Sequence, residues 1–234
     1  LTFGVSASFL TKLGLEKKRP KLFRDLPAFP KEQLREQYTG GDIVIQACAD
    51  DEQVAFHAVR NLIRKGRNKV TMKWSQSGFA AIGDRMETPR NLFGFKDGTA
   101  NVTTEKDFDK VVWADSQDWM NNGSYMAVRR IIMHLETWDR TNLQEQENTF
   151  GRYKESGAPF GKKDEFDEVD LSLLPVDSHV RLAKEVDMPI LRRSYSYSDG
   201  IDPKTGQFDA GLLFIAFQKD PDRFVKIQTN LGAD

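Results

Sequence analysis

The first clear pattern of hydrophobic and polar residues along the chain lies between residues 42 and 74. Asp42–Ala49 is mostly apolar, which is typical of a short buried strand. Apolar residues then recur at helical spacing as far as Gly66, and either Asp50 or Asp51 is suited to cap the start of this helix. Alternation over Lys69–Trp74 predicts a second strand.

The chain opens on strand-like sequence at Leu1–Val5, and Leu13–Gln37 is charged and interrupted by prolines, so we expect mostly loop there. The first residue is not methionine, and no basic-plus-apolar targeting pattern follows it. We therefore expect a fragment or a processed form.

A second series of elements begins after Ser124. Tyr125–Trp138 is rich in Val, Ile and Met and predicts a long strand. Residues 139–141 can cap a helix that ends at Gly151. The long polar connection over 152–178 is unusual inside a compact domain, and such connections tend to carry function.

Two further strands and a closing helix complete this series. Ile190–Tyr197 and Gly211–Gln218 predict strands joined by a turn at 199–206, and Asp220 and Pro221 open the helix. Strand, helix, strand, strand, helix is a ferredoxin-like order.

We therefore predict an α+β fold of two ferredoxin-like sandwich units side by side, the first of them incomplete. The predicted divisions are a partial N-terminal unit over 1–90, a loop and connection over 91–123, and a C-terminal unit over 124–234.

Composition argues against several classes of protein. The 34 basic and 35 acidic residues give a net charge of −1, which argues against a nucleic-acid scaffold. No apolar run approaches the roughly 18 to 20 residues of a membrane helix. The single cysteine, Cys48, excludes an internal disulfide framework, and its apolar surroundings predict burial. The 16 phenylalanines suit either a pocket for a flat apolar ligand or an ordinary core.

Three segments carry candidate chemistry: Gly94–Asn101 with an aspartate, Asp177–Leu182 with a histidine, and Leu191–Tyr195 with two arginines. An acid, a histidine and an arginine can hold a metal-bound oxidant if the fold brings them together. If the last segment is a strand, Arg192 and Arg193 face opposite sides, so only one of them can reach the site.

At these motifs the chain resembles the dye-decolorising peroxidases (DyP), and within them the iron-transport-associated Efe type. The resemblance runs through the GxxDG motif at 94–98 and through residues 145–159, 177–183, 191–197 and 211–218. It implies the DyP-type dimeric α+β barrel and one haem b per chain.

The resemblance also implies roles for three residues. His179 would be the proximal haem ligand, because imidazole suits iron, whereas His57 and His134 have no accompanying motif. Asp97 would stand on the distal face and move a proton between the peroxide oxygens, although Asp-Gly alone is also a turn signal. Arg192, favoured over Arg193 by its spacing from the ligand, would stabilise the developing negative charge.

Other cofactor contacts are implied less sharply. Small residues after the distal acid would let the backbone approach the haem: Gly98, Thr99 and Ala100. Asn101 would either bond to the distal pocket or cap the turn. Arg181 would either pair with a haem propionate or be a solvated charge, and Phe214 would either shield the distal side or pack in the core.

The function implied is a haem peroxidase that reduces hydrogen peroxide and oxidises dyes, phenols and similar bulky donors. Electrons could reach the haem through aromatic residues, each of which can also be simple packing: Trp113, Trp119, Trp138, Tyr125, Tyr195 and Tyr197. The alternatives are a deferrochelatase role in an iron-uptake system and a cofactor-free ferredoxin-like binding domain. The Efe-type resemblance further implies export to the cell envelope or beyond by the twin-arginine route, and an oligomer is possible.

The pH dependence of turnover tests the aspartate. Free aspartate has a pKa of about 3.9, so a carboxylate base stays ionised in mildly acidic solution. We expect turnover of peroxide and dye to favour acidic pH in a pH–rate profile. Undiminished turnover in the alkaline range would count against an aspartate base.

Overall fold

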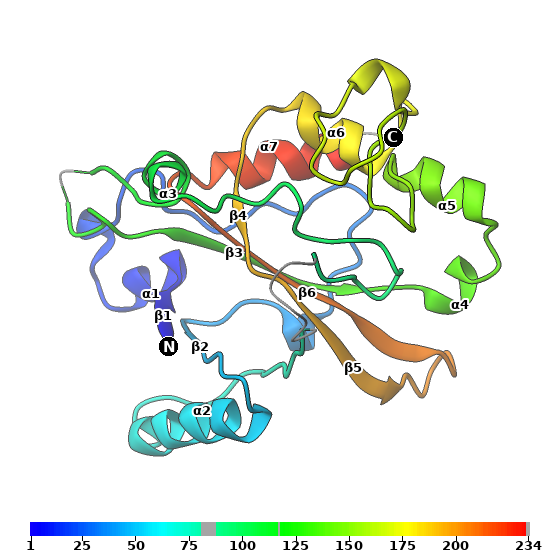
Figure 1. Ribbon diagram of the computed structural model, residues 1–234. Coiled ribbons are helices and arrows are strands. Elements are labelled where there is room, and N and C mark those ends of the chain that lie inside the picture. Colours follow the sequence, from blue (N-terminus) through cyan, green and yellow to red (C-terminus); the bar gives the residue numbers. More distant parts are fainter. Residues whose placement is uncertain (81–87, 117, 233–234) are drawn as a thin grey trace.

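The computed structural model describes residues 1–80, 88–116 and 118–232, and an antiparallel sheet built around one long strand forms its centre (Figure 1). That strand is β6 (Phe208–Gln218), and β3 (Tyr125–Ile132) pairs along one of its edges. Its other edge pairs with β4 (Leu191–Arg192) and β5 (Tyr195–Ile201). The register continues across the break between β4 and β5, where the Arg193 N–H donates to the Ile215 carbonyl at 2.8 Å.

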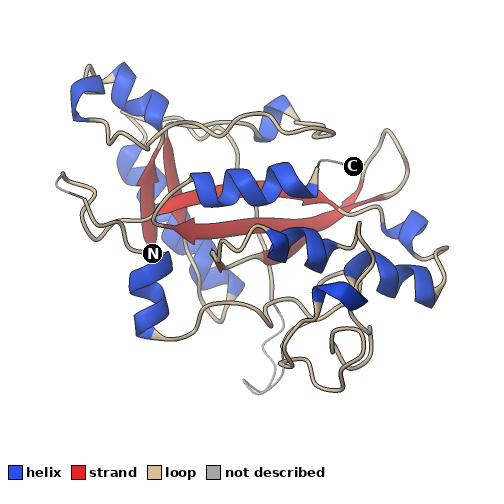
Figure 2. Ribbon diagram, turned by 90° about the horizontal axis from the view of Figure 1, so that it is seen from above, coloured by secondary structure: helices blue, strands red, loops and turns tan. Residues whose placement is uncertain are grey.

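Helices cover one face of this sheet. Figure 2 shows α7 (Asp222–Leu231) lying over the sheet, and α6 (His179–Glu185) packs on α7. Phe224 of α7 meets Phe29 edge-on, with 5.9 Å between ring centroids, above the buried Ala127 of β3. A residue from the N-terminal loop therefore completes the core of the C-terminal sheet.

The predicted α+β class and the antiparallel sheet are confirmed, with corrections at the element ends. The strand from Tyr125 ends at Ile132, because a short helix, α4 (Leu135–Trp138), follows. The cap of α5 (Leu143–Phe150) is Asn142, whose side chain accepts from the Glu145 N–H at 3.0 Å, rather than a residue of 139–141.

The first part of the chain is smaller. β1 (Thr2–Val5) and β2 (Ile43–Gln46) form a two-stranded antiparallel sheet. α2 (Glu52–Gly66) follows as predicted, and the Asp51 carboxylate caps it by accepting from the Gln53 N–H at 2.7 Å. The segment predicted as loop, 13–37, holds two short 3₁₀ turns, Glu16–Lys18 and Glu36–Tyr38, and is otherwise irregular. A short helix, α1 (Ala7–Lys12), separates it from β1.

Two predictions for this part are wrong. Lys69–Trp74 pairs with no strand among the described residues, and its Val70 and Met72 side chains are 43% and 57% exposed, so the alternation faces solvent. Cys48 is exposed, because β2 ends at Gln46 and the chain leaves the sheet before it reaches the cysteine. Residues 81–87 of the first predicted unit lie outside the described residues.

Four short helices went unpredicted: α1, α3 (Glu105–Val111), α4 and α6. Each has seven residues or fewer, which is too short for helical periodicity to emerge from the sequence. None of the helices in the described ranges has the length and apolarity needed to cross a bilayer.

The second face of the sheet is tied to the N-terminal part by Arg130. Its guanidinium lies 4.2 Å from the ring centroid of Tyr38 and 4.1 Å from that of Tyr197. It also pairs with Asp199 and Asp209, both at 2.9 Å. Burial raises the pKa of Tyr197 to about 12, so this phenol stays protonated. Stacking of this kind stabilises a buried arginine through both charge and contact.

Gly211 tests the packing of the central strand. A Cβ there would collide with the Ile131 carbonyl oxygen and come within 3.0 Å of the Met133 nitrogen, both of them backbone atoms. Because backbone cannot move aside as a side chain can, we expect Gly211→Ala to lower the free energy of unfolding by about 3 kcal/mol in urea denaturation.

Gly232→Ala is the matched control. The added methyl would lie 3.4 Å or more from its neighbours, and the residue has an ordinary φ of −103°. We expect this substitution to change stability by less than about 0.5 kcal/mol. Equal unfolding midpoints for the two variants would contradict the packing around β6.

Candidate active site

The segment around Asp97 is a tight hairpin held by its own polar groups. The Asn91 N–H donates to the Phe95 carbonyl at 2.9 Å, and the Asn91 side-chain oxygen accepts from the Phe93 N–H at 3.0 Å. Gly94 has φ +83° and Gly98 φ +131°, where a side chain would be strained. The two glycines of the GxxDG motif thus shape the backbone on either side of the aspartate.

Asp97 meets Arg192 of β4. The Arg192 guanidinium donates from Nη1 to Asp97 Oδ1 at 2.7 Å, and both side chains are partly exposed. Arg193 faces the other side of the sheet, where its Nε donates to the Tyr195 hydroxyl at 3.1 Å and that hydroxyl donates to Cys48 Sγ at 3.2 Å. Arg192, and not Arg193, is therefore the arginine beside the carboxylate.

Asn101 fastens this hairpin to the strand. Its side-chain Nδ2 donates to the Arg192 carbonyl at 2.7 Å, and its Oδ1 accepts from the Arg192 N–H at 2.9 Å. The amide thereby copies the pairing that a neighbouring strand would make. The Asn101 N–H also donates to the Gly98 carbonyl at 2.9 Å and closes a turn. Asn101 thus serves both the site and the turn.

His179 is the first residue of α6. Burial lowers its pKa, the Arg192 guanidinium lowers it further, and the Asp97 carboxylate acts in the opposite direction. The residue nevertheless keeps accessible surface. Protein atoms therefore surround much of the imidazole, and solvent still reaches the residue. A histidine with a lowered pKa is neutral at neutral pH, so it can offer a lone pair to a metal.

Phe150 connects the two sides of the site. Its ring stacks on Phe95 with 4.0 Å between centroids and 11° between planes, and lies 6.0 Å from the His179 ring. Phe150 ends α5, and Gly151 at φ +81° then turns the chain so close to the buried Ser178 that a Cβ at Gly151 would lie 3.0 Å from the Ser178 hydroxyl. The aspartate hairpin and the histidine helix are thus packed against one aromatic ring.

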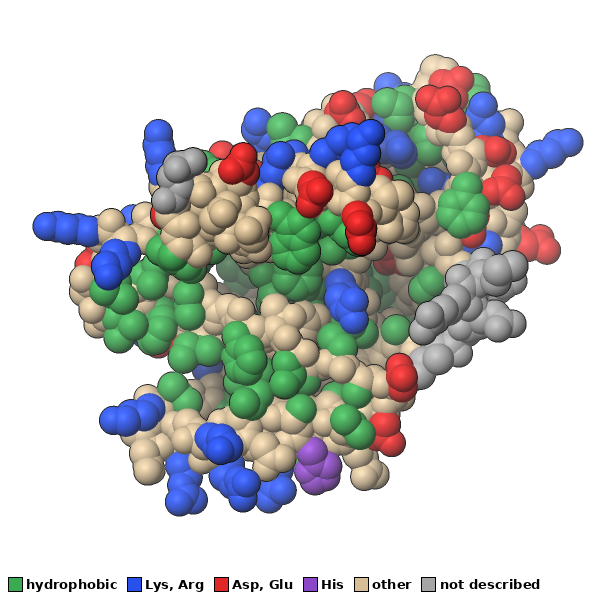
Figure 3. Space-filling view, turned by 60° about the vertical axis from the view of Figure 1, so that its left-hand side comes forward, with side chains coloured by type: hydrophobic (Ala, Val, Ile, Leu, Met, Phe, Trp, Pro, Cys, Tyr) green, Lys and Arg blue, Asp and Glu red, His purple; other side chains and the backbone are tan. Residues whose placement is uncertain are grey.

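These donors fit a haem better than a bare metal ion. Among the residues that the structure describes, no three His, Cys, Asp or Glu side chains gather to hold a metal. A single neutral imidazole can nevertheless hold iron when a porphyrin supplies the other ligands. Hydrophobic side chains gather around a recess on one face of the molecule (Figure 3). The buried Thr99 Oγ1, within the aspartate loop, has no partner among the described protein atoms.

The other predicted cofactor residues occupy different settings. Arg181 pairs with Glu185 at 2.9 Å and donates to the Leu174 carbonyl at 3.0 Å. Phe214 lies 5.6 Å from Phe224 in the core under α7. By strand alternation Phe214 shares the sheet face of Arg192, whose register partner is Ala216. Ala100 follows Thr99 at the surface of the aspartate loop.

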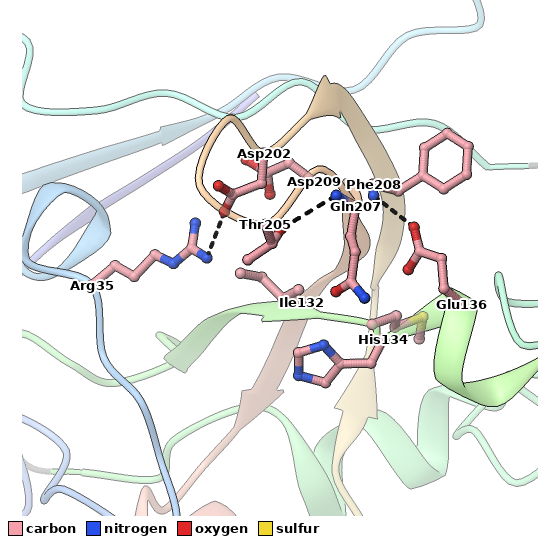
Figure 4. A pocket seen from close by; sticks show the side chains of 10 residues that line it. Arg35, Ile132, His134, Glu136, Asp202, Thr205, Gln207, Phe208 and Asp209 are labelled. Atoms are coloured by element: carbon pink, nitrogen blue, oxygen red, sulfur yellow. Dashed lines mark hydrogen bonds and ion pairs between the residues drawn. The ribbon is translucent and has the colours of Figure 1, made fainter.

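A separate cavity lies at the far end of the sheet (Figure 4). Its volume of about 40 Å³ suits water and is far too small for a porphyrin. Arg35 pairs there with Asp202 at 3.1 Å, and the Phe208 N–H donates to Glu136 at 2.8 Å. These contacts hold the β5–β6 turn and do not involve the Asp97 site.

Comparison with known proteins shows to which family the chain belongs. A family model described as Dyp-type peroxidase, C-terminal, matches residues 88–234, and its N-terminal counterpart matches residues 1–80. The chain belongs to the Dyp-type peroxidase family. DyP-family peroxidases are haem proteins, in agreement with the donor set around His179.

Individual relatives agree with this family assignment. Deferrochelatase of Escherichia coli K12 is 38% identical over 257 aligned residues, which cover all of this chain and 60% of that protein. DtpA from Streptomyces lividans, solved as an oxyferrous complex, has a TM-score of 0.93 and 38% identity over 99% of this chain and 68% of its own. A DyP-type peroxidase from Streptomyces coelicolor gives 0.92 and 38% over the same shares. The chain thus spans 60% of the length of the deferrochelatase.

Three residues near the site were not predicted from the sequence. Lys96, Arg152 and Glu165 surround the aspartate hairpin in the DyP fold, and their side chains are largely buried. Lys96 lies inside the GxxDG motif and Arg152 follows Phe150-Gly151, so proximity to motifs could have marked them. Glu165 stands in a run of charged residues, and only the unusual length of its loop pointed there.

Asn101 tests the link between hairpin and strand. Asn101→Ala removes two hydrogen bonds to the Arg192 backbone, each worth about 1 kcal/mol, so we expect a loss of about 2 kcal/mol in the free energy of unfolding. The control is Asn148→Ala, whose side chain makes one exposed bond to Gln144 at 3.0 Å. A loss for Asn101→Ala no larger than the control's would contradict the assigned link.

Proposed function

We propose that this chain carries the site of a haem b peroxidase that reduces hydrogen peroxide and oxidises bulky one-electron donors such as dyes and phenols. The observation that carries the proposal is the Asp97–Arg192 pair, 2.7 Å apart and within electrostatic reach of His179. A carboxylate and a guanidinium on one side and a neutral imidazole on the other are the groups that peroxide chemistry at iron requires. Family membership supports the proposal.

Haem held by His179 would supply the redox chemistry. The chain's own residues then have separate tasks. Asp97 takes a proton from one peroxide oxygen and returns it to the other, which a carboxylate within hydrogen-bond reach can do. Arg192 holds fixed positive charge where negative charge develops. Asn101 keeps these two groups in register through its bonds to the Arg192 backbone.

The proposed roles of the other cofactor residues rest on where these residues lie relative to Asp97 and Arg192. Gly98, Thr99 and Ala100 lie directly after the acid and would line the haem face, and the unpartnered Thr99 hydroxyl supports a polar contact there. A propionate contact by Arg181 requires its guanidinium to serve both Glu185 and the haem. Phe214 would border the pocket from the sheet face that it shares with Arg192.

A second candidate function is removal of iron from haem, because the Escherichia coli relative is a deferrochelatase. From the family resemblance we also propose export by the twin-arginine route, a place in an iron-uptake system and an oligomeric assembly. Anaerobic incubation with haem separates the two functions: metal-free porphyrin formed without peroxide would favour the chelatase. We also propose the division into units over 1–90, 91–123 and 124–234.

Substitution of the three central residues tests the peroxidase. His179→Ala should abolish the Soret band of ferric haem, because the imidazole is the proposed iron ligand. Asp97→Asn and Arg192→Leu should keep the Soret band and slow the reaction with peroxide about 10² to 10⁴-fold in stopped-flow spectra.

His57→Ala is the control for histidine loss, since His57 is exposed on α2. It should leave both haem binding and the peroxide reaction unchanged. Full haem ligation in His179→Ala would overturn the assignment, and so would unimpaired peroxide reaction in Asp97→Asn.

A further inference from the structure

Glu165 holds both ends of the segment that carries Asp97. Its side chain is 7% exposed, and Lys96 Nζ forms an ion pair with Oε2 at 3.2 Å, an oxygen that accepts no hydrogen bond from the described protein atoms. Its Oε1 accepts from the Thr88 hydroxyl at 3.1 Å. Thr88 directly precedes the hairpin residues that pair with Lys96 and Asp97, and Lys96 directly precedes Asp97. One carboxylate from the long 152–178 loop therefore holds the hairpin at two points.

Arg152 fixes Glu165 from inside the same loop. Its Nη1 donates to the Gly157 carbonyl at 2.6 Å and to the Glu165 carbonyl at 2.9 Å. Burial lowers the pKa of Arg152, Glu165 raises it, and Arg192 lowers it. Three cations and two carboxylates thus lie close together, and Glu165 is the anion that compensates Lys96 and Arg152.

Close packing around this pair leaves little room for movement. Gly157 has φ +77°, and a Cβ there would come within 2.7 Å of Lys96 Cδ and 3.3 Å of Glu165 Cβ. A second set of bonds fastens the same two segments, because Arg90 donates to the Gly94 carbonyl at 2.8 Å and to the Lys154 carbonyl at 2.6 Å. The long loop and the hairpin therefore form one interlocked unit.

Loss of the Glu165 charge would change the position of the Lys96 side chain. A buried cation without its partner is strongly disfavoured, so Lys96 would move its ammonium toward water. The peptide bond to Asp97 would transmit that movement to the neighbouring carboxylate. A displacement of about 1 Å at a reacting group is enough to cost about 10²-fold in rate.

We propose that Glu165 is a positioning residue that, through Lys96, sets the place of Asp97 against Arg192. Its effect on peroxide chemistry rests on the proposed function, whereas its effect on the hairpin does not. The long polar loop would then act as a clamp on the aspartate segment, with Glu165 as the contact point.

The test uses a set of variants of the full chain: Glu165→Gln, Glu165→Asp, Lys96→Met and the Lys96→Met/Glu165→Gln pair. Glu168→Gln is the matched control, since Glu168 is an exposed acid of the same loop whose side chain makes no ion pair with the described residues. Amide hydrogen exchange of residues 94–98 is measured with and without haem. Peroxide kinetics are measured on the haem-loaded protein.

We expect exchange at 94–98 to be faster by about tenfold in Glu165→Gln than in the parent, with and without haem. The rate constant for peroxide should fall about 10 to 100-fold while the Soret band is kept. Glu165→Asp should recover part of both effects. The double variant should match the single variants, because residues that act through one contact are not additive.

Unchanged protection of 94–98 in Glu165→Gln would overturn the proposal, and so would an equal effect of Glu168→Gln. If Glu165→Gln does not fold, the double variant decides, because it removes the Lys96 charge together with its partner and should still loosen 94–98. A parent that does not react with peroxide would contradict the proposed function, while the exchange measurement would still decide the role of Glu165.

Discussion

The contact between the Asp97 hairpin and Arg192 is the constraint on which the site depends. Its partners are more than ninety residues apart in the sequence, and three hydrogen bonds join them: two between the Asn101 amide and the Arg192 backbone, and one from the Arg192 guanidinium to the Asp97 carboxylate. A loop laid over a sheet edge must satisfy its polar groups or remain in water. Asn101 and Asp97 do so by pairing with one residue of β4, which fixes both the loop and the arginine.

Two kinds of interaction hold the parts of the site around that contact. Aromatic packing joins the hairpin to the histidine, since Phe150 touches both Phe95 and His179. Charge and hydrogen bonding join the hairpin to the long loop, through Lys96 and Glu165. The aromatic side chains can be buried without hydrogen-bond partners. The buried charges on the side of the long loop are stable only while each keeps its opposite charge.

Local signals in the sequence predicted much of this arrangement. The helix from Glu52, the closing helix and the opposite faces of Arg192 and Arg193 followed from periodicity, which depends on neighbours along the chain. The predictions of a strand over Lys69–Trp74 and of a buried Cys48 were wrong. A strand and a buried thiol both need a partner distant in the sequence, which the sequence alone does not show. Glu165 escaped notice for the same reason: its meaning lies in Lys96, sixty-nine positions earlier.

The exposed Cys48 offers a practical handle. It is the one thiol of the sequence, and it contacts Tyr195 on the sheet face opposite to Arg192. A maleimide dye or a spin label would therefore attach at a single defined position, behind the strand that carries Arg192. Such a probe could report on the seam between the N-terminal strands and the central sheet without contacting Arg192 or Asp97.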